Sequence, residues 1–479
     1  MAREFRAALL LSLPILLPLA GSASAASVDP VPMEEYSARR HNLAESLRDS
    51  LPPGQLGVLL LRSLPEPENA TFRQDSNLYY FTGTQIPDSA LVLLFDRPAS
   101  PGDSSKPAAP RYAEYFYLPE RDFGQERWKG AKLGAGGLEK DSLRPDAERL
   151  STMRLTGFNK IPDGDFPPRS FPKGPVEKLG DLQAHLKRFL ASSGVFYFGA
   201  DPGTLGSPLS EELVFLTEVR ARYPDLQIKD PRPAMGRLRM VKSAAEIAQI
   251  RKAVEITCQA LRDAFRAASA GTPEYRVQAE IERRFTHEGA RRPGYPSIVG
   301  SGPNSCVLHY DANERTLRHG DLLLMDVGAE FRRYTADVTR TIPVGGRFSS
   351  EQRKVYDVVL KAQEAVFSII QPGIAFAELD RTARRVITDA GYGQYFIHGT
   401  SHFLGLDVHD TGDRSALLQR GMVFTVEPGI YIPEKELGVR VEDDVVVTDS
   451  GVEVLSSCLP RAADAVEMQT RNASRPGSR

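Results

Sequence analysis

Two stretches of sequence decide the fold: GDLLLMDVGAEFRRYTADVTRTIPV at residues 320–344 and GMVFTVEPGIYIPEKELGVRVEDDVVVTD at residues 421–449. Each combines an apolar run, a turn region and a second run rich in β-branched residues, which predicts two hairpins of similar build. Each also places acidic residues among apolar ones. An acid buried in an apolar strand is costly unless it is protonated, paired or bound to a cation.

The two stretches place their acids at similar points, one near the end of the first strand and one in the second strand. These acids are Asp326 and Asp337 in the first stretch, and Glu427 and Glu442 in the second. Because side chains alternate along a strand and hairpin strands lie side by side, we expect the four carboxylates to converge. The segment GTSHFLGLDVHD lies between the stretches and offers a fifth ligand, His402.

Four converging carboxylates repel one another and retain protons unless cations neutralise them. Carboxylate oxygens with a single imidazole suit Mn²⁺, Co²⁺, Zn²⁺ or Fe²⁺ better than a thiolate-type zinc site does. Four acids are more than one catalytic ion needs, which favours two cations about 3.5–4 Å apart. Each acid alone would be interpreted as a strand-end or edge residue. The joint pattern predicts metal-assisted hydrolysis.

The whole chain has 479 residues and a formal net charge of −2. This length predicts two folded domains. The balanced charge gives no electrostatic case for nucleic acid, and we expect no nucleic-acid partner.

The N-terminus has the pattern of a secretory signal peptide. Arg3 and Arg6 precede an apolar run, and the small residues Ala23 and Ala25 flank Ser24. This pattern predicts a Sec-type signal peptide over residues 1–25, cleaved after Ala25, and a periplasmic or secreted protein without a membrane anchor.

The sequence contains three cysteines, Cys258, Cys306 and Cys458. Export permits disulfides, but an odd and widely spaced set does not predict a disulfide framework. Cys258 falls in a helical pattern and is interpreted as a core residue. Cys306 stands near His309, and we favour packing over catalysis for this thiol.

The pattern divides the chain into two domains after the signal peptide. Residues 27–235 alternate strands with helices and predict an α/β domain, with strands at 78–82 and 90–95. Residues 240–458 read helix, helix, strands and then the same order again, which predicts an α+β domain built from a weak internal duplication. Residues 459–479 are expected to form a flexible tail.

Six motifs in the second domain carry a family resemblance: VGSGPNSCVLHY (299–310), LLLMDVGAE (322–330), YTADVTRT (334–341), HGTSHFLGLDVHD (398–410), FTVEPGIYI (424–432) and VRVEDDVVVT (439–448). They resemble the pita-bread metallopeptidases, above all the aminopeptidase P and prolidase group of Xaa-Pro peptidases. The similarity runs from Lys242 to about Ser457. The segment RQDSNLYYFTG resembles the N-terminal domain of that family less specifically.

The resemblance implies five metal ligands for two divalent cations, preferably Mn²⁺: Asp326, Asp337, His402, Glu427 and Glu442. Asp337 and Glu442 would bridge the cations. Glu427 would also act as general base toward a hydroxide held between them.

Further roles are implied by the same motifs. His309 and His409 would contact the substrate, assist proton transfer and stabilise the developing oxyanion. His398 and Tyr295 would line the proline side of the pocket. A hydrogen-bonded pair beside the metals would consist of Tyr431 and Arg440, with Glu66 or Glu68 as candidate acidic partners from the N-terminal domain. Trp128 matches a tryptophan that some members send into a neighbouring active site, and an ordinary surface aromatic is an equal interpretation.

The implied function is removal of the N-terminal residue from peptides whose second residue is proline. Prolidase activity on Xaa-Pro dipeptides is the nearest alternative, because the motifs do not separate the two. An alternative of another class is a non-catalytic peptide-binding protein on the same fold, which the complete ligand set disfavours. The family also implies a homo-oligomer, either a dimer or a tetramer.

Overall fold

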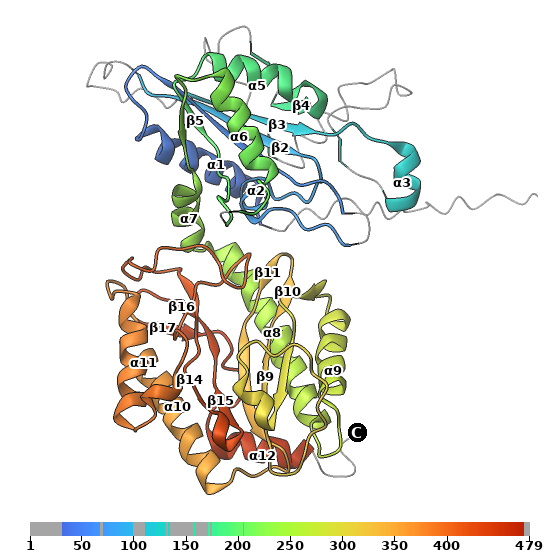
Figure 1. Cartoon of the computed structure of the whole chain (residues 1–479), viewed down its shortest axis with the longest axis vertical. Helices are drawn as coiled ribbons and strands as arrows, with labels where there is room; N and C mark the ends of the chain where they lie inside the picture. Colours follow the sequence, from blue (N-terminus) through green and yellow to red (C-terminus); the bar gives the residue numbers. More distant parts are fainter. Residues whose placement is uncertain are drawn as a thin grey trace, which may run out of the picture.

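A computed structural model of the chain describes residues 31–67, 70–98, 111–130, 133–134, 157–158, 171–172, 175–204 and 206–473. The expected signal peptide therefore lies outside the described residues. Within them, no helix combines the length and the apolar character needed to cross a membrane. Figure 1 shows two parts, an N-terminal one in blue and green and a C-terminal one in yellow to red.

The N-terminal part is built on one six-stranded sheet in the order β4-β3-β2-β1-β5-β6. The strands are β1 (Leu56–Arg62), β2 (Ala90–Asp96), β3 (Tyr112–Leu118), β4 (Val176–Lys178), β5 (Val195–Tyr197) and β6 (Gln227–Lys229). The helices are α1 (Met33–Arg48), α2 (Ser76–Thr82), α3 (Phe123–Lys129), α5 (Leu182–Ala191), α6 (Glu211–Arg222) and α7 (Arg232–Met240). Strands β1, β2 and β3 pair antiparallel, whereas β4, β5 and β6 add parallel pairs. The mixed α/β interpretation is confirmed.

One element of this part was assigned wrongly from the sequence. The run LYYF predicts a strand near residues 78–82, but residues 76–82 form helix α2. The Asp75 carboxylate caps its first turn by accepting a hydrogen bond from the Leu78 N–H at 2.8 Å. Gly83 ends it with a φ of 65°, a conformation that favours glycine. The two caps outweigh the β propensity of the aromatic residues between them.

The C-terminal part repeats one order of elements. The first half comprises α8 (Ala244–Ala267), α9 (Glu274–His287), β7 (Arg292–Pro293), β8 (Ile298–Ser301), β9 (Leu322–Val327), β10 (Ala329–Phe331), β11 (Tyr334–Thr335) and β12 (Val338–Pro343). The second half comprises α10 (Ser350–Ile369), α11 (Ala377–Asp389), β13 (Val423–Val426), β14 (Gly429–Ile432), β15 (Leu437–Arg440), β16 (Asp443–Val447) and β17 (Val452–Val454). In Figure 1, α9 and α11 stand on opposite sides of the central strands.

The repeat extends to local detail. Both α8 and α10 begin with a capping box, in which Ser243 and Ser349 exchange hydrogen bonds with Glu246 and Gln352. Each half also sets a three-stranded antiparallel sheet beside its acids, in the order β12-β9-β8 and β13-β16-β17, and the first half has a second such sheet, β11-β10-β7. The expected pseudo-twofold pita-bread architecture is thus present, and its two sheets deliver the acidic residues.

The end of the chain is more ordered than the sequence predicted. Residues 463–473 form helix α12 in place of a flexible tail from residue 459. Val466 on this helix is fully buried, and the Glu467 carboxylate accepts a hydrogen bond from the Phe348 N–H at 3.0 Å. These contacts hold the helix against the core, so the flexible-tail prediction is wrong for these residues.

A disulfide joins Cys258 on α8 to Cys458, across a sequence separation of 200 residues. The expectation of no disulfide framework is therefore wrong. An odd cysteine count hid the pair, because Cys306 remains free.

We expect this disulfide to stabilise the fold by about 5 kcal/mol, because it closes a very long loop in the unfolded chain. Reductant should lower the free energy of unfolding of the wild type and of Cys306→Ala, measured by denaturant titration. The double variant Cys258→Ala/Cys458→Ala should not respond to reductant. A wild type that is equally stable with and without reductant would contradict this expectation.

Candidate metal centre

The four acids stand where the strand ladders of the C-terminal part stop. Asp326 lies on β9 opposite Thr339, and Asp337 directly precedes β12. Glu427 directly follows β13, and Glu442 lies between β15 and β16. The sequence placed two of these acids inside strands, but the structure places them at strand ends, where the ladder leaves side chains free to turn into the interior.

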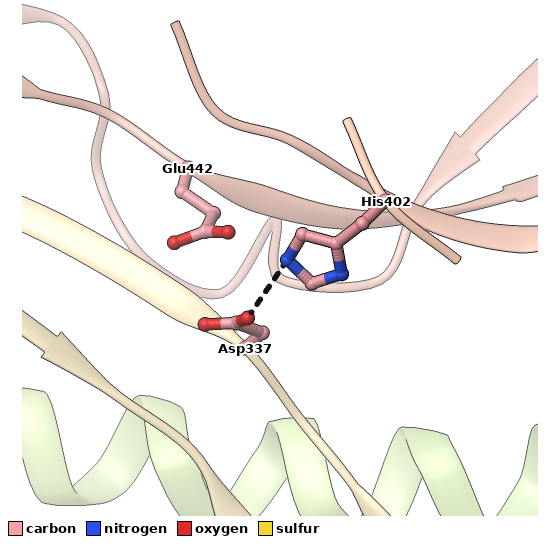
Figure 2. Close-up of side chains that lie close together, drawn as sticks. All are labelled: Asp337, His402 and Glu442. Atoms are coloured by element: carbon pink, nitrogen blue, oxygen red, sulfur yellow. Dashed lines mark ion pairs between the residues drawn. The ribbon is translucent and has the colours of Figure 1, made fainter. Parts of the chain in front are cut away.

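Three of the expected ligands form a compact cluster (Figure 2). One ligand atom each from Asp337, His402 and Glu442 lies within 4.8 Å of the other two, and all three residues are buried. The His402 Nε2 atom lies 3.3 Å from Asp337 Oδ2 and 3.3 Å from Glu427 Oε1. Its Nδ1 lies 3.1 Å from the Phe403 carbonyl oxygen, which can only accept a hydrogen bond. Nδ1 therefore donates its proton to this carbonyl oxygen, which orients the ring so that Nε2 faces the carboxylates.

Tyr295 and Arg440 connect the remaining acid to this cluster. The Tyr295 hydroxyl lies 2.6 Å from Asp326 Oδ1 and 2.5 Å from Asp337 Oδ1. The Arg440 guanidinium donates to Asp326 Oδ2 at 2.6 Å. Asp326, Asp337, His402, Glu427 and Glu442 all line one cavity of about 540 Å³.

The electrostatics of the cluster are those of crowded, buried carboxylates. Burial and the charges of Asp326 and Asp444 raise the pKa of Asp337 well above its ordinary value. Burial and the charges of Asp337 and Glu427 do the same for Glu442. Burial also raises the pKa of Glu427. Burial opposes ionisation of Asp326 too, but Arg440 and the Tyr295 hydroxyl outweigh it and lower the pKa of Asp326.

This donor set fits divalent cations. Carboxylate oxygens and one oriented imidazole nitrogen are the ligands that Mn²⁺, Co²⁺, Zn²⁺ or Fe²⁺ accept. Among the described residues, Arg440 is the arginine that pairs with one of the four carboxylates, that of Asp326, whereas Arg340 reaches only the backbone carbonyl oxygen of Glu442, at 2.6 Å. Cations would supply the positive charge that the other three acids lack.

The other predicted site residues line the same cavity, except Tyr431 and Trp128. His309, His398, His409 and Tyr295 line it together with Arg440. Trp128 does not line it. It lies on α3 of the N-terminal part, and its side chain is 90% exposed. A role for Trp128 in a neighbouring subunit stays a prediction.

A chain of hydrogen bonds runs along one wall of the cavity. The Arg440 Nη1 atom donates to the Tyr431 hydroxyl at 2.8 Å, and this hydroxyl lies 2.9 Å from His398 Nε2. His398 Nδ1 faces the Gly399 carbonyl oxygen at 2.8 Å, so Nε2 accepts the tyrosine proton. Burial and the nearby Arg440 charge lower the pKa of His398 to about 4. His398 is therefore neutral at physiological pH.

The expected acidic partner from the N-terminal domain is not among the contacts of this wall. The acid that Arg440 contacts is Asp326, and Glu66 instead pairs with Lys129 at 3.1 Å. The other candidate, Glu68, lies outside the described residues.

Sequence reasoning missed Asp444, a fully buried acid next to the ligands. Its Oδ2 accepts a hydrogen bond from the Asp337 N–H at 2.9 Å and so fixes the backbone of a ligand. Burial raises the pKa of Asp444 well above its ordinary value. A signal was available: the run VEDDVVV contains three acids among valines, and the cost argument applied to Glu442 holds for all three.

The N-terminal part reaches the segment that carries His409. Arg73 donates to the Leu406 carbonyl oxygen at 2.7 Å and to Asp407 Oδ1 at 3.2 Å. Arg239, at the end of α7, donates to Asp407 Oδ2 at 2.8 Å and also pairs with Asp410. These bonds hold the chain on both sides of His409, at Asp407 and at Asp410. The N-terminal part therefore helps to position His409.

Comparisons with protein-family models and with known relatives support a metallopeptidase site. Models of the metallopeptidase family M24 and of the aminopeptidase P N-terminal domain match residues 248–449 and 36–154. Over 469 residues the chain is 32% identical to the Xaa-Pro aminopeptidase of Escherichia coli (strain K12), covering 91% of this chain and 97% of that protein. Over 223 residues it is 40% identical to the Xaa-Pro dipeptidase of Pyrococcus furiosus, covering 46% of this chain and 64% of the relative.

A solved structure extends the likeness to three dimensions. Zinc-substituted E. coli aminopeptidase P in complex with product superposes with a TM-score of 0.74 at 29% identity, covering 93% of this chain and 100% of that chain. Two family models, a relative matched over nearly its whole length and a shared fold all point the same way. The chain therefore belongs to the Xaa-Pro aminopeptidase/prolidase family of pita-bread metallopeptidases, and it is a metallo-aminopeptidase.

Proposed function

We propose that this enzyme is an exported aminopeptidase that hydrolyses the first peptide bond of chains with proline in second position, using two divalent cations. The observation that carries the proposal is the convergence of four buried acids and one imidazole on a cavity of about 540 Å³. When bound, the cations supply Lewis-acid activation of water and of the scissile carbonyl. Asp326, Asp337, His402, Glu427 and Glu442 would hold them, and Mn²⁺ is the preferred metal among Mn²⁺, Co²⁺, Zn²⁺ and Fe²⁺.

Glu427 is the general base of the proposed mechanism. It accepts the proton of the attacking water and passes it to the leaving proline nitrogen. The Thr425 hydroxyl, which donates to Glu427 Oε1 at 3.2 Å, orients the carboxylate.

Three histidines have the remaining roles in the proposed mechanism. His409 stands against His402, with ring centroids 4.3 Å apart, and stabilises negative charge on the scissile carbonyl oxygen. His309 contacts the substrate and assists proton transfer. The neutral ring of His398, held by Tyr431 and Arg440, packs with Tyr295 against the proline side of the substrate. The amide nitrogen of proline is tertiary, so general exopeptidases cleave the bond before proline poorly. A subsite shaped for the proline ring would bind such substrates.

Cleavage of two tripeptides that differ only in their second residue tests the proposal. With Mn²⁺ present, the purified enzyme should release the first residue from an Ala-Pro-Ala tripeptide. It should leave Ala-Ala-Ala essentially uncut. Failure to cleave the proline tripeptide, or equal rates on both peptides, would overturn the proposed specificity.

Prolidase activity is the second candidate, favoured by the 40% identity over 223 residues to the Pyrococcus furiosus dipeptidase. That similarity covers 46% of this chain, whereas the Escherichia coli aminopeptidase relative covers 91%. The longer match includes the N-terminal part, whose arginines bind residues on both sides of His409. We therefore expect the Ala-Pro-Ala tripeptide to be cleaved faster than the Ala-Pro dipeptide, and the opposite order would favour the prolidase.

Substitution Glu427→Gln removes the proposed base and one charged cation ligand together. We expect kcat on the tripeptide to fall by roughly a hundredfold or more, because general-base catalysis of this kind contributes factors of that size. The fold should persist, since glutamine keeps the shape of the side chain. Full activity in a folded Glu427→Gln enzyme would remove Glu427 from the role of base.

Export and assembly complete the proposal. The pattern of residues 1–25 supports cleavage after Ala25 and a periplasmic or secreted enzyme. The Cys258–Cys458 disulfide is in keeping with an oxidising compartment. Mass spectrometry of the exported protein should find Ala26 at the N-terminus, and an intact Met1 would contradict it. We also propose a homo-oligomer, which light scattering of the full chain would test.

A further inference from the structure

A buried glutamine on α10 contacts the backbone beside two of the expected cation ligands. The Gln363 Nε2 atom donates to the carbonyl oxygens of Val426 at 3.0 Å and Val441 at 3.1 Å. Val426 directly precedes Glu427, and Val441 directly precedes Glu442. The same nitrogen lies 3.0 Å from Asp443 Oδ2, so its two N–H groups are shared among three acceptors. One side-chain amide thus joins the two segments that carry the catalytic glutamates.

These contacts fall in a gap between two strand ladders. The β13–β16 ladder ends at the pair Val426 and Asp443, and the β14–β15 ladder begins at Gly429 and Arg440. Glu427 and Glu442 lie in this gap, which lets both side chains enter the cavity. A carbonyl group in such a gap, buried away from water, needs a donor from elsewhere. Gln363 is fully buried and supplies it.

The backbone N–H group of each glutamate is also hydrogen-bonded. The Glu427 N–H donates to the Thr400 carbonyl oxygen at 2.9 Å, and the Glu442 N–H donates to the Thr339 carbonyl oxygen at 3.1 Å. Each ligand backbone is therefore held from one side by a neighbouring segment and from the other by Gln363. The Gln363 Oε1 atom has no hydrogen-bond partner among the described residues. Its amide therefore acts in this structure as a donor only.

The other half of the molecule carries a counterpart. Thr257 on α8 and Gln363 on α10 stand at equivalent positions counted from their capping residues, Ser243 and Ser349. The Thr257 hydroxyl is also fully buried, and it accepts a hydrogen bond from the Ala329 N–H at 3.0 Å, just beyond the strand that carries Asp326. Each repeat thus places a polar side chain of its first helix against the backbone where a ligand strand ends.

We propose that Gln363 is a positioning residue for cation binding, which sets the distance between the Glu427 and Glu442 carboxylates through their backbones. It does not touch substrate or cation. The inference rests on the proposed two-cation site and extends it to a residue outside the cavity lining. Hydrogen-bonding groups that orient metal ligands typically contribute about 10–100-fold to metal affinity.

Substitution Gln363→Met tests the role, because methionine has similar length and no donor. The readout is the affinity of the metal-free full-length chain for Mn²⁺, from competition with a chromogenic chelator. We expect the affinity for at least one Mn²⁺ to fall about tenfold or more. The lost activity should return as Mn²⁺ is raised to saturation, with KM for the tripeptide unchanged.

Val355→Ala is the matched control, since Val355 is a fully buried residue two turns earlier on α10. It should lower thermal stability while leaving Mn²⁺ affinity at the wild-type value. Wild-type Mn²⁺ affinity in folded Gln363→Met would overturn the proposal. A Gln363→Met chain that does not fold, while Val355→Ala does, would give Gln363 a purely structural role and would also overturn it. A wild-type chain that binds no Mn²⁺ would instead refute the two-cation site itself.

Discussion

Substitution Asp337→Asn should abolish nearly all peptidase activity while leaving the metal-free fold more stable than the wild type. Asp337 contributes to the three-residue cluster with His402 and Glu442, and the amide cannot replace its negative charge toward a cation. We expect kcat/KM on the tripeptide to fall at least about a thousandfold, equal to ~4 kcal/mol of transition-state stabilisation.

The gain in stability follows from the pKa of the same group. Burial and the charges of Asp326, Asp444 and Glu427 raise the pKa of Asp337, so ionisation is less favourable in the folded chain than in the unfolded chain. A neutral isostere removes this penalty at neutral pH. Denaturant titration in excess chelator should therefore show a larger free energy of unfolding for Asp337→Asn than for the wild type.

Thr341→Val provides a control for substitution in the same strand. Thr341 lies on β12, and its hydroxyl donates to the Arg440 carbonyl oxygen rather than to a ligand carboxylate. The Thr341→Val enzyme should be less stable than the wild type but should not lose activity a thousandfold. An active Asp337→Asn enzyme would refute the assignment of Asp337 as a cation ligand.

Divalent cations should stabilise the wild type strongly, and the gain in Tm should grow as the pH rises. In the metal-free fold the pKa values of Asp337 and Glu442 are raised from 3.8 and 4.5. A raised folded-state pKa contributes stability at pH values below the unfolded pKa, and that contribution is lost as the pH rises through the folded value. The metal-free enzyme should therefore lose stability with rising pH over this window.

Bound cations reverse this loss because they replace the protons at the carboxylates. At a cation concentration about a thousand times the dissociation constant, binding stabilises the fold by about 4 kcal/mol. Differential scanning calorimetry at several pH values, with Mn²⁺ or with chelator, measures the difference. A gain in Tm that stays constant or shrinks with rising pH would contradict the account. Mg²⁺ in place of Mn²⁺ controls for ionic strength, since it binds nitrogen ligands poorly.

The catalytic domain could be predicted from sequence because its signals reinforce one another. The acids of residues 320–344 and 421–449 interrupt apolar strands, and burial makes such interruptions too costly to be incidental. His402, Tyr295 and Arg440 converge with them in the structure, as the family motifs implied. The repeat of elements was visible in the order of helices and strands alone.

The misassignments have separate physical causes. Helix α2 formed against the β propensity of its aromatic residues because Asp75 and Gly83 cap it. The Cys258–Cys458 bond joins residues from the two ends of the domain, and such a pairing cannot be deduced from spacing. Helix α12 is held by tertiary contacts, the packing of Val466 and the hydrogen bond of Glu467 to the Phe348 N–H, which its own sequence does not reveal.

The supporting contacts of the site were the least predictable. Gln363 lies on a helix far from the motifs, and its role depends on which carbonyl groups the interrupted ladders leave facing it. The bonds of Arg73 to the His409 segment depend on how the two parts dock. Sequence patterns predict which groups are costly to bury, but partners from distant elements follow only from the folded chain.

The central claim is that five side chains hold two cations, and counting cations bound to the chain tests it most directly. Metal-free full-length enzyme would be titrated with Mn²⁺ in a calorimeter while cleavage of Ala-Pro-Ala is followed in parallel. The account predicts two Mn²⁺ per chain, with activity absent before titration and complete after it. Full activity in a chain shown by elemental analysis to contain no divalent metal would contradict it.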